Sequence, residues 1–291
     1  MNTIDDILQY FDSIHMKQAT AALLSESRRS PDAMPFPPAD KLGKHCTITH
    51  RIYDHRPAFF LTPSQPKIRL LYFHGGAYYN DFAPSHWRLL GRLMREMNAE
   101  VVAPDYPLTP IFGHRDVFSM VTQVYRDCLT NLPEGGLVVA GDSAGGGIAL
   151  ALTQWALQEG LPLPRRLALL SPWLDATMGD PKIAELDRVD PFLEPLSGKQ
   201  ICEWYRQGED PHFYQISPLF GPLAGLPPTM VFTGTRDILN VDAQNLALRM
   251  AEADSVCRLY QAEGMIHTWM LFPIEEAQAP LAQLRDFLLG N

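Results

Sequence analysis

The run LVVAGDSAGGGIALAL over residues 137–152 constrains the fold of this chain more than any other segment. Its first residues are apolar and predict a buried parallel strand, and the small residues from Ala144 onward predict the start of a helix. Between them, Gly141-Asp142-Ser143-Ala144-Gly145 matches the GxSxG elbow, in which a serine occupies a strained turn between strand and helix. The flanking glycines let strand and helix pass closely. The segment therefore predicts a serine hydroxyl held above the edge of a sheet.

A GxSxG pattern also fits a glycine-rich turn that only begins a helix, so its context decides between the two interpretations. The elbow requires a strand before the serine, a helix after it, and an acid and then a histidine further along the chain. Each of these conditions is met in this sequence. The context therefore favours a nucleophilic serine.

Predicted strands and helices alternate around this elbow, as in a mostly parallel sheet. Three closely spaced strand candidates come first and favour an antiparallel start to the sheet; they cover 46–53, 58–62 and 68–73. Later strands are expected at 100–104, 137–141, 166–172, 229–234 and 256–260, and helices at 114–131, 144–158, 241–252 and 276–289. The pattern predicts an α/β fold.

Three segments lie outside this alternation. Residues 4–24 have apolar side chains at helical spacing and predict one amphipathic helix with an acidic outer face. The prolines of residues 30–40 exclude a helix and predict an extended connector. Residues 176–215 are rich in prolines, glycines and charges, and predict an insertion with short helices over the active face. We therefore expect one α/β domain over residues 1–291, with an insertion.

Composition excludes several classes of protein. A chain of 291 residues with 46% hydrophobic and 20% charged residues is typical of a soluble globular domain with a large core. Its net charge of -9 argues against nucleic acid or an anionic membrane surface as the main partner. No leader and no apolar stretch of membrane-spanning length is recognised, so we expect a cytoplasmic protein. The cysteines have no metal-ligand spacing and are expected to be free thiols; they are Cys46, Cys128, Cys202 and Cys257.

A serine hydroxyl becomes nucleophilic when a histidine, itself held by a carboxylate, removes its proton. His267 follows the last predicted strand, at the sheet edge where the carboxyl ends of parallel strands meet. Asp237 follows the preceding strand, and Asp242 is the alternative acid. Asp242 falls where a helix begins and is more typical of a first-turn residue. We therefore predict Ser143 as nucleophile, His267 as base and Asp237 as acid.

The segment LYFHGGAYY at 71–79 is expected to supply donors for an oxyanion. Consecutive glycines after a strand allow a sharp turn that presents backbone N–H groups inward. Gly75 and Gly76 are the candidates in this loop, and the N–H of Ala144 completes the predicted oxyanion hole. His74 is expected to brace the loop.

Aromatic residues near these motifs are candidates for substrate binding. Tyr78, Tyr79, Trp204 and Tyr205 either wall an acyl or alcohol pocket or belong to the core, and both interpretations stay open. The histidines without a catalytic context are expected on the surface or in packing; they are His45, His50, His55, His86 and His114.

Six motifs, in this order, are similar to those of the hormone-sensitive lipase family of α/β-hydrolases, particularly its bacterial carboxylesterases. They are HGGA at 74–77, GDSAGG at 141–146, SPWLD at 171–175, SPLFGPLAGLPP at 217–228, GTRDIL at 234–239 and GMIH at 264–267. The resemblance extends from about residue 68 to the end of the chain. Ala77 stands where the family usually has a third glycine, and Ile238 where it commonly has a proline.

This resemblance implies an α/β-hydrolase fold with an eight-stranded, mostly parallel sheet and a helical cap formed by residues 1–40 and 176–215. It implies hydrolysis of short acyl esters of small molecules, without a cofactor or metal, by the same Ser143, Asp237 and His267. An arylformamidase or other small-amide hydrolase is an alternative of the same fold. A non-catalytic protein that binds a small ligand is an alternative of another class. The oligomeric state is left open, with a homo-oligomer among the possibilities.

Overall fold

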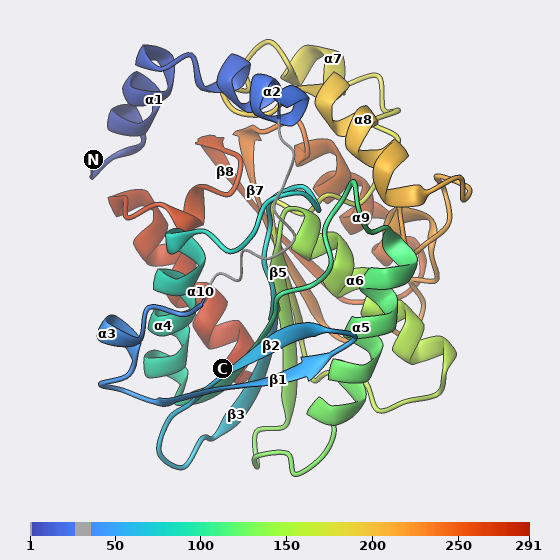
Figure 1. The fold of residues 1–291 in the computed structure, drawn as a ribbon. Coiled ribbons are helices and arrows are strands. Elements are labelled where there is room, and N and C mark those ends of the chain that lie inside the picture. The colour runs from blue at the N-terminus through green and yellow to red at the C-terminus, as the bar shows by residue number, and fades with distance from the viewer. Residues whose placement is uncertain (1, 27–35) are drawn as a thin grey trace.

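An eight-stranded sheet runs through the centre of the molecule in the order β1-β2-β4-β3-β5-β6-β7-β8 (Figure 1). The computed structural model describes residues 2–26 and 36–291. The strands are β1 (Thr47–Tyr53), β2 (Arg56–Thr62), β3 (Ile68–Phe73), β4 (Ala99–Pro104), β5 (Leu137–Asp142), β6 (Leu167–Leu170), β7 (Thr229–Arg236) and β8 (Cys257–Ile266). The mostly parallel α/β-hydrolase sheet predicted from the sequence is thereby confirmed.

The antiparallel start of the sheet differs in detail from the prediction. β2 pairs antiparallel with β1 and with β4, whereas β3 pairs parallel with β4 and β5. The third strand candidate is therefore the first parallel strand. After β3 the chain crosses over through a helix, so β4 lies beside β3 and runs in the same direction. Sequence spacing alone does not show which neighbour a strand pairs with.

Helices cover both faces of the sheet (Figure 1). They are α4 (Pro84–Met97) and α10 (Gln278–Leu289) on one face, and α5 (His114–Cys128), α6 (Ala144–Gln158) and α9 (Asn240–Glu252) on the other. Leu70 and Tyr72 of β3 pack with the first pair, and Leu71 and Phe73 with the second group. Successive strand residues point to opposite faces, so a strand buried on both sides is apolar throughout.

The N-terminal segment differs from the single helix predicted over residues 4–24. It forms two helices, α1 (Ile4–Ser13) and α2 (Met16–Glu26). His15 lies between them with a φ of 49°, a left-handed conformation that interrupts the helix. Apolar spacing continues across this break, which is why periodicity did not reveal it.

The proline-rich connector lies partly outside the described residues. Of residues 30–40, the structure describes 36–40, and these lead into the short helix α3 (Ala39–Leu42) rather than an extended segment throughout. Pro38 immediately precedes the helix, at a position where the missing N–H of proline is not needed by the helix.

The insertion 176–215 contains α7 (Ile183–Leu186) and α8 (Pro195–Arg206). Together with α1 and α2, these helices lie beyond the carboxyl ends of β7 and β8 (Figure 1). Short 3₁₀ helices follow at Pro218–Phe220, Trp269–Leu271 and Glu275–Ala277. Segments far apart in the sequence therefore meet at the edge of the sheet where catalytic residues were expected.

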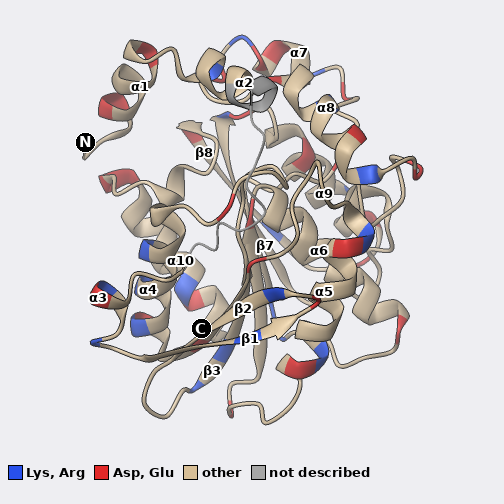
Figure 2. Cartoon of the chain, in the orientation of Figure 1, with Lys and Arg blue, Asp and Glu red and all other residues tan. Residues whose placement is uncertain are grey.

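Charged residues are distributed over both sides of the sheet. In Figure 2 the acidic and basic residues of the described chain are interspersed over helices and loops. In the same part of the chain, no helix combines the length and the apolar composition needed to cross a bilayer.

Candidate active site

Ser143 occupies the turn between β5 and α6. Its backbone φ of 52° and ψ of -122° lie outside the regions that L-residues usually adopt, and its N–H donates to the carbonyl of Leu170 at 2.9 Å. A Cβ on Gly141 would lie 2.3 Å from the carbonyl oxygen of Gly145. Glycine at these positions therefore permits the sharp turn that presents the serine, as the GxSxG pattern predicts.

The structure brings Ser143, His267 and Asp237 into one chain of contacts. His267 Nε2 lies 2.9 Å from Ser143 Oγ, and His267 Nδ1 lies 2.9 Å from Asp237 Oδ2. Because a carboxylate only accepts hydrogen bonds, Nδ1 carries the proton of the neutral ring, which leaves Nε2 to accept from the serine hydroxyl. The second oxygen of Asp237 accepts the N–H of Leu239 at 2.9 Å. Both carboxylate oxygens are therefore held in place.

The surroundings of His267 favour its protonated form. Burial disfavours the imidazolium, but the carboxylate of Asp237, with smaller contributions from Asp190 and Asp142, outweighs this and raises the pKa of His267. The imidazole is 3% exposed, so little water screens these charges. The histidine is therefore a better base than an isolated imidazole.

Two of the predicted oxyanion donors lie next to Ser143: Ala144 directly follows it, and a Cβ on Gly75 would lie 3.0 Å from the Ser143 Cβ. Within the described residues, none of the backbone N–H groups of Gly75, Gly76 and Ala144 donates a hydrogen bond to the protein. Ala144 is the first residue of α6, where backbone N–H groups have no partner inside the helix. His74 Nδ1 lies 2.6 Å from the Gly75 carbonyl oxygen, and so contacts the loop it was expected to brace.

A pocket of about 60 Å³ opens at Ser143. Its lining comes from α2, the 77 loop, the segment after β6, α8 and the loop after β7, and is mostly apolar. The lining residues are Thr20, Ala77, Ser143, Trp173, Met178, Leu193, Glu194, Ser197, Gly198, Ile201, Ile238 and Leu239. A larger hollow of about 530 Å³ lies between α3 and α4, but none of the residues predicted for catalysis borders it.

Comparison with known proteins shows the family. Residues 70–271 match the model of a family described as having the alpha/beta hydrolase fold. The chain belongs to this α/β-hydrolase family. An acetyl-hydrolase of Streptomyces hygroscopicus is 30% identical over 74% of this chain and 73% of its own length. An esterase of Acinetobacter venetianus is 28% identical over 75% of this chain and 73% of its own.

The fold comparison agrees with this assignment. The crystal structure of EstE7, an HSL homologue from a metagenome library, has a TM-score of 0.83 and 25% sequence identity, and covers 98% of this chain and 97% of its own. The resemblance to bacterial carboxylesterases of the hormone-sensitive lipase type is therefore confirmed.

Of the four aromatic residues predicted near the site of this α/β-hydrolase, Tyr78, Tyr79 and Tyr205 are buried and Trp204 is partly buried. Tyr78 stacks on Tyr205 with 3.9 Å between ring centroids, and Tyr79 stacks on Trp204 at 5.9 Å. None of the four borders the pocket at Ser143. The two stacks join the 77–79 loop to α8, and Trp173 is the aromatic residue among those that border this pocket. A substrate-binding role for the four stays a prediction.

Asp242, the alternative acid, has different partners. It lies in the first turn of α9, and its Oδ2 accepts the N–H groups of Leu174 and Asp175 at 2.8 and 2.9 Å. It therefore fixes the loop after β6, and of the two candidates Asp237 is the one that contacts His267.

Asp242→Asn is expected to change how stability depends on pH. Burial raises the pKa of Asp242 to about 8, far above the value of about 4 in an unfolded chain. Between these values the folded state holds a proton that the unfolded state lacks, so this carboxyl destabilises the fold as pH rises from about 4 to about 8. Asparagine does not titrate, so over this pH range the unfolding free energy of the variant rises relative to that of wild type by up to about 1.4 kcal/mol per pH unit. Urea unfolding at pH 5 and pH 7.5 measures this gain, and a difference independent of pH contradicts it.

Sequence reasoning missed the support beneath the oxyanion loop. Asp142 Oδ1 accepts the Tyr72 hydroxyl at 2.7 Å, and Oδ2 lies 3.3 Å from His86 Nε2. His86 Nδ1 accepts the N–H of Ala83, so Nε2 carries the proton and donates to Asp142. A Cβ on Gly75 would lie 2.2 Å from Asp142 Oδ2. The residue before the nucleophile therefore packs directly against the predicted oxyanion loop.

Proposed function

We propose that this α/β-hydrolase is a carboxylesterase that hydrolyses short-chain acyl esters of small molecules through a Ser143 acyl-enzyme. The observation that carries the proposal is the unbroken chain of contacts from Asp237 through His267 to Ser143, with 2.9 Å at each step. Relatives named acetyl-hydrolase and esterase support the same reaction class.

In this mechanism the Ser143 oxygen attacks the ester carbonyl carbon while His267 Nε2 takes the hydroxyl proton. The carbonyl π electrons move to oxygen, and the resulting oxyanion accepts hydrogen bonds from the backbone N–H groups of Gly75, Gly76 and Ala144. The imidazolium then gives its proton to the alcohol oxygen as the bond from carbon to that oxygen breaks. Water, deprotonated by the same imidazole, attacks the acyl-enzyme and releases the acid and Ser143.

The pocket supports a preference for short acyl groups. A volume of about 60 Å³, bordered by Trp173, Met178 and Ile201, leaves space for only a few carbon atoms beside Ser143. Its apolar lining favours an alkyl group over a charged one.

We also propose that residues 1–40 and 176–215 act as the cap of this site. Thr20 from α2 and Ile201 from α8 border the same pocket as Ser143, which supports this assignment for the described part of both segments. Residues 27–35 of the expected cap lie outside the described residues. A reducing cytoplasm is the proposed compartment, in keeping with four free cysteines.

Purified protein is expected to hydrolyse p-nitrophenyl acetate and butyrate with a kcat/KM at least about 10-fold above that for the decanoate ester, because a small pocket excludes long chains. A fluorophosphonate probe is expected to label Ser143, as located by peptide mass spectrometry. Ser143→Ala is the unlabelled control, and Ser255→Ala, which changes a buried serine bonded to the Leu223 carbonyl, should label normally.

The outcomes of this experiment separate the functions considered. Faster turnover of formyl-anilides than of esters identifies an amide hydrolase. A protein that neither turns over esters nor reacts with the probe contradicts the esterase and favours a binding protein.

A further inference from the structure

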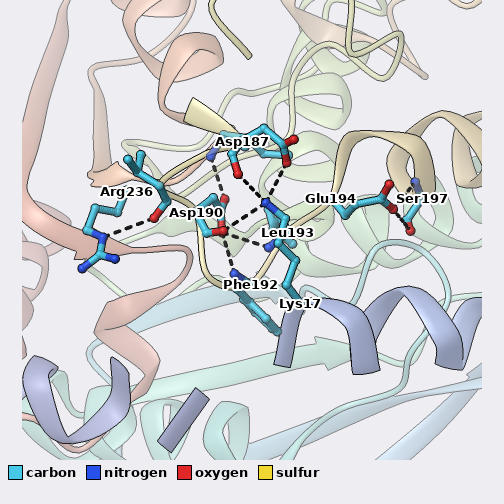
Figure 3. A network of polar contacts seen from close by, with 10 residues as sticks. Lys17, Asp187, Asp190, Phe192, Leu193, Glu194, Ser197 and Arg236 are labelled. Carbon is cyan, nitrogen blue, oxygen red and sulfur yellow. Dashed lines mark hydrogen bonds and ion pairs between the residues drawn. The ribbon is translucent and has the colours of Figure 1, made fainter. Parts of the chain in front are cut away.

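A second buried carboxylate, Asp190, lies beside the acid of the proposed triad. It belongs to the loop between α7 and α8 and is 3% exposed. Its Oδ2 accepts the N–H of Ile238 at 2.8 Å. Its Oδ1 accepts the N–H groups of Phe192 and Leu193 at 2.7 and 2.9 Å (Figure 3). One side chain thus joins the insertion to the loop that follows β7.

The bond to Ile238 acts on the backbone that carries Asp237. Ile238 directly follows Asp237, so its N–H belongs to the peptide group formed by the Asp237 carbonyl. The next N–H, from Leu239, donates to Asp237 Oδ1 itself. Two successive N–H groups after the acid are therefore occupied by carboxylates. The first of these bonds exists only because residue 238 is not proline, which has no N–H.

The N-terminal helix α2 holds the same loop from outside. Lys17 Nζ donates to Asp187 Oδ1 at 2.7 Å and to the carbonyl of Asp190 at 3.1 Å, as well as to the carbonyl of Asp187 (Figure 3). Arg236, at the end of β7, donates from Nε to the carbonyl of Val189 at 3.2 Å. The loop 187–190 is therefore bonded to α2 on one side and to the end of β7 on the other.

We propose that Asp190 is a positioning residue for Asp237, and that Lys17 makes this positioning depend on helix α2. Among the described residues, Asp190 is not bonded to the proposed nucleophile Ser143; it accepts a hydrogen bond from the peptide group that follows Asp237. The N-terminal helices then serve catalysis as well as covering the pocket. The inference rests on the proposed function, because ester hydrolysis is one of its readouts.

The charges around this site support the role. Burial, followed by repulsion from Asp237, raises the pKa of Asp190 to about 6, although the three N–H groups oppose the rise. The carboxylate is therefore mostly ionised at neutral pH and contributes to raising the pKa of His267.

Asp190→Asn is the decisive variant, because asparagine keeps the shape and one accepting oxygen but turns an N–H₂ group toward an N–H donor. We expect kcat for p-nitrophenyl acetate to fall by about 10- to 100-fold. We also expect the pKa of His267, followed by NMR on ¹⁵N-histidine-labelled protein, to move lower, since a negative charge has been removed. This second reading needs no turnover, so it tests the inference even if the esterase proposal fails.

The Ile238→Pro background isolates the bond itself. Proline removes the N–H that Asp190 accepts, so Asp190→Asn should lower kcat much less in this background than in wild type. An equal fall in both backgrounds, an unmoved His267 pKa, or a kcat within twofold of wild type overturns the role of Asp190.

Lys17→Met tests the contribution of α2 independently of Ile238. It keeps the aliphatic stem and removes the ammonium, and we expect a fall in kcat of several-fold that Lys17→Arg largely restores. Arg126 lies in α5, on the face of the sheet opposite α4, and forms an exposed ion pair with Glu159. Arg126→Met is the matched control, because it breaks this pair and should leave kcat unchanged. Equal activity of Lys17→Met and wild type overturns the role of Lys17.

Discussion

Asp237→Asn is expected to lower kcat by about 10⁴-fold with little change in KM. An asparagine keeps the shape but presents an N–H₂ group or a neutral oxygen to His267 Nδ1, where the carboxylate now lies at 2.9 Å. If the amide nitrogen faces the ring, Nδ1 must accept, and the proton moves to Nε2, which can then no longer take the proton of Ser143. If the oxygen faces the ring, the imidazolium formed during attack lacks its counter-charge.

Asp242→Asn is the matched control for this variant. Both aspartates are buried and five residues apart, but Asp242 bonds to the loop after β6 rather than to His267. We expect kcat of Asp242→Asn within about 10-fold of wild type, measured with p-nitrophenyl acetate under saturating conditions. The reverse ranking of the two variants would assign the acid to Asp242 and contradict the proposed triad.

The sequence predicts well what local chemistry determines. The elbow at Ser143 follows from glycines, an apolar strand and a helix that are contiguous in the chain, and the structure has β5 and α6 at those residues. The positions of Asp237 and His267 follow from one rule, that parallel strands end at the same edge of the sheet. Five of the six family motifs are placed by the same rule, since they lie at the carboxyl ends of strands or directly after them.

Contacts between distant segments could not be predicted in this way. Asp190 meets Ile238 across 48 residues, and His86 meets Asp142 across 56. The sequence does not show which distant group the side chain of Asp190 or of His86 will contact. A partial signal exists for Asp190: a residue after the acid that is not proline has an N–H that must find an acceptor once it is buried.

Side-chain stacking and an edge strand account for two further differences between the sequence predictions and the structure. Tyr78 and Tyr205 are aromatic, as residues of a pocket wall often are, but they stack on each other with 3.9 Å between ring centroids, and neither borders the pocket at Ser143. β8 continues to Ile266 through the polar residues Gln261 and Glu263, beyond the predicted end at residue 260. An edge strand with one side exposed tolerates such residues, so hydropathy ends the strand too early.

Gly145→Ala is expected both to destabilise the fold and to disrupt the predicted oxyanion hole. A Cβ at this position would lie 2.2 Å from the carbonyl oxygen of Phe73 and 2.4 Å from that of His74. These are backbone atoms at the end of β3, so they cannot move aside as a flexible side chain would. Either α6 or the loop carrying Gly75 and Gly76 must shift. We expect a loss of more than about 3 kcal/mol in unfolding free energy and a fall of about 100- to 1,000-fold in kcat/KM.

Gly160→Ala separates this close approach from the general cost of replacing a glycine. Gly160 has a φ of +65° with no atom within 4 Å of an added Cβ, so alanine there meets backbone strain alone, of about 1–2 kcal/mol. Thermal unfolding and p-nitrophenyl acetate kinetics of both variants give the comparison. Because Gly145 abuts the end of β3 whereas Gly160 lies at the far end of α6, only Gly145→Ala should reduce kcat/KM among the molecules that remain folded. Equal kcat/KM in the two variants would show that the approach of α6 to β3 does not set the position of the oxyanion donors.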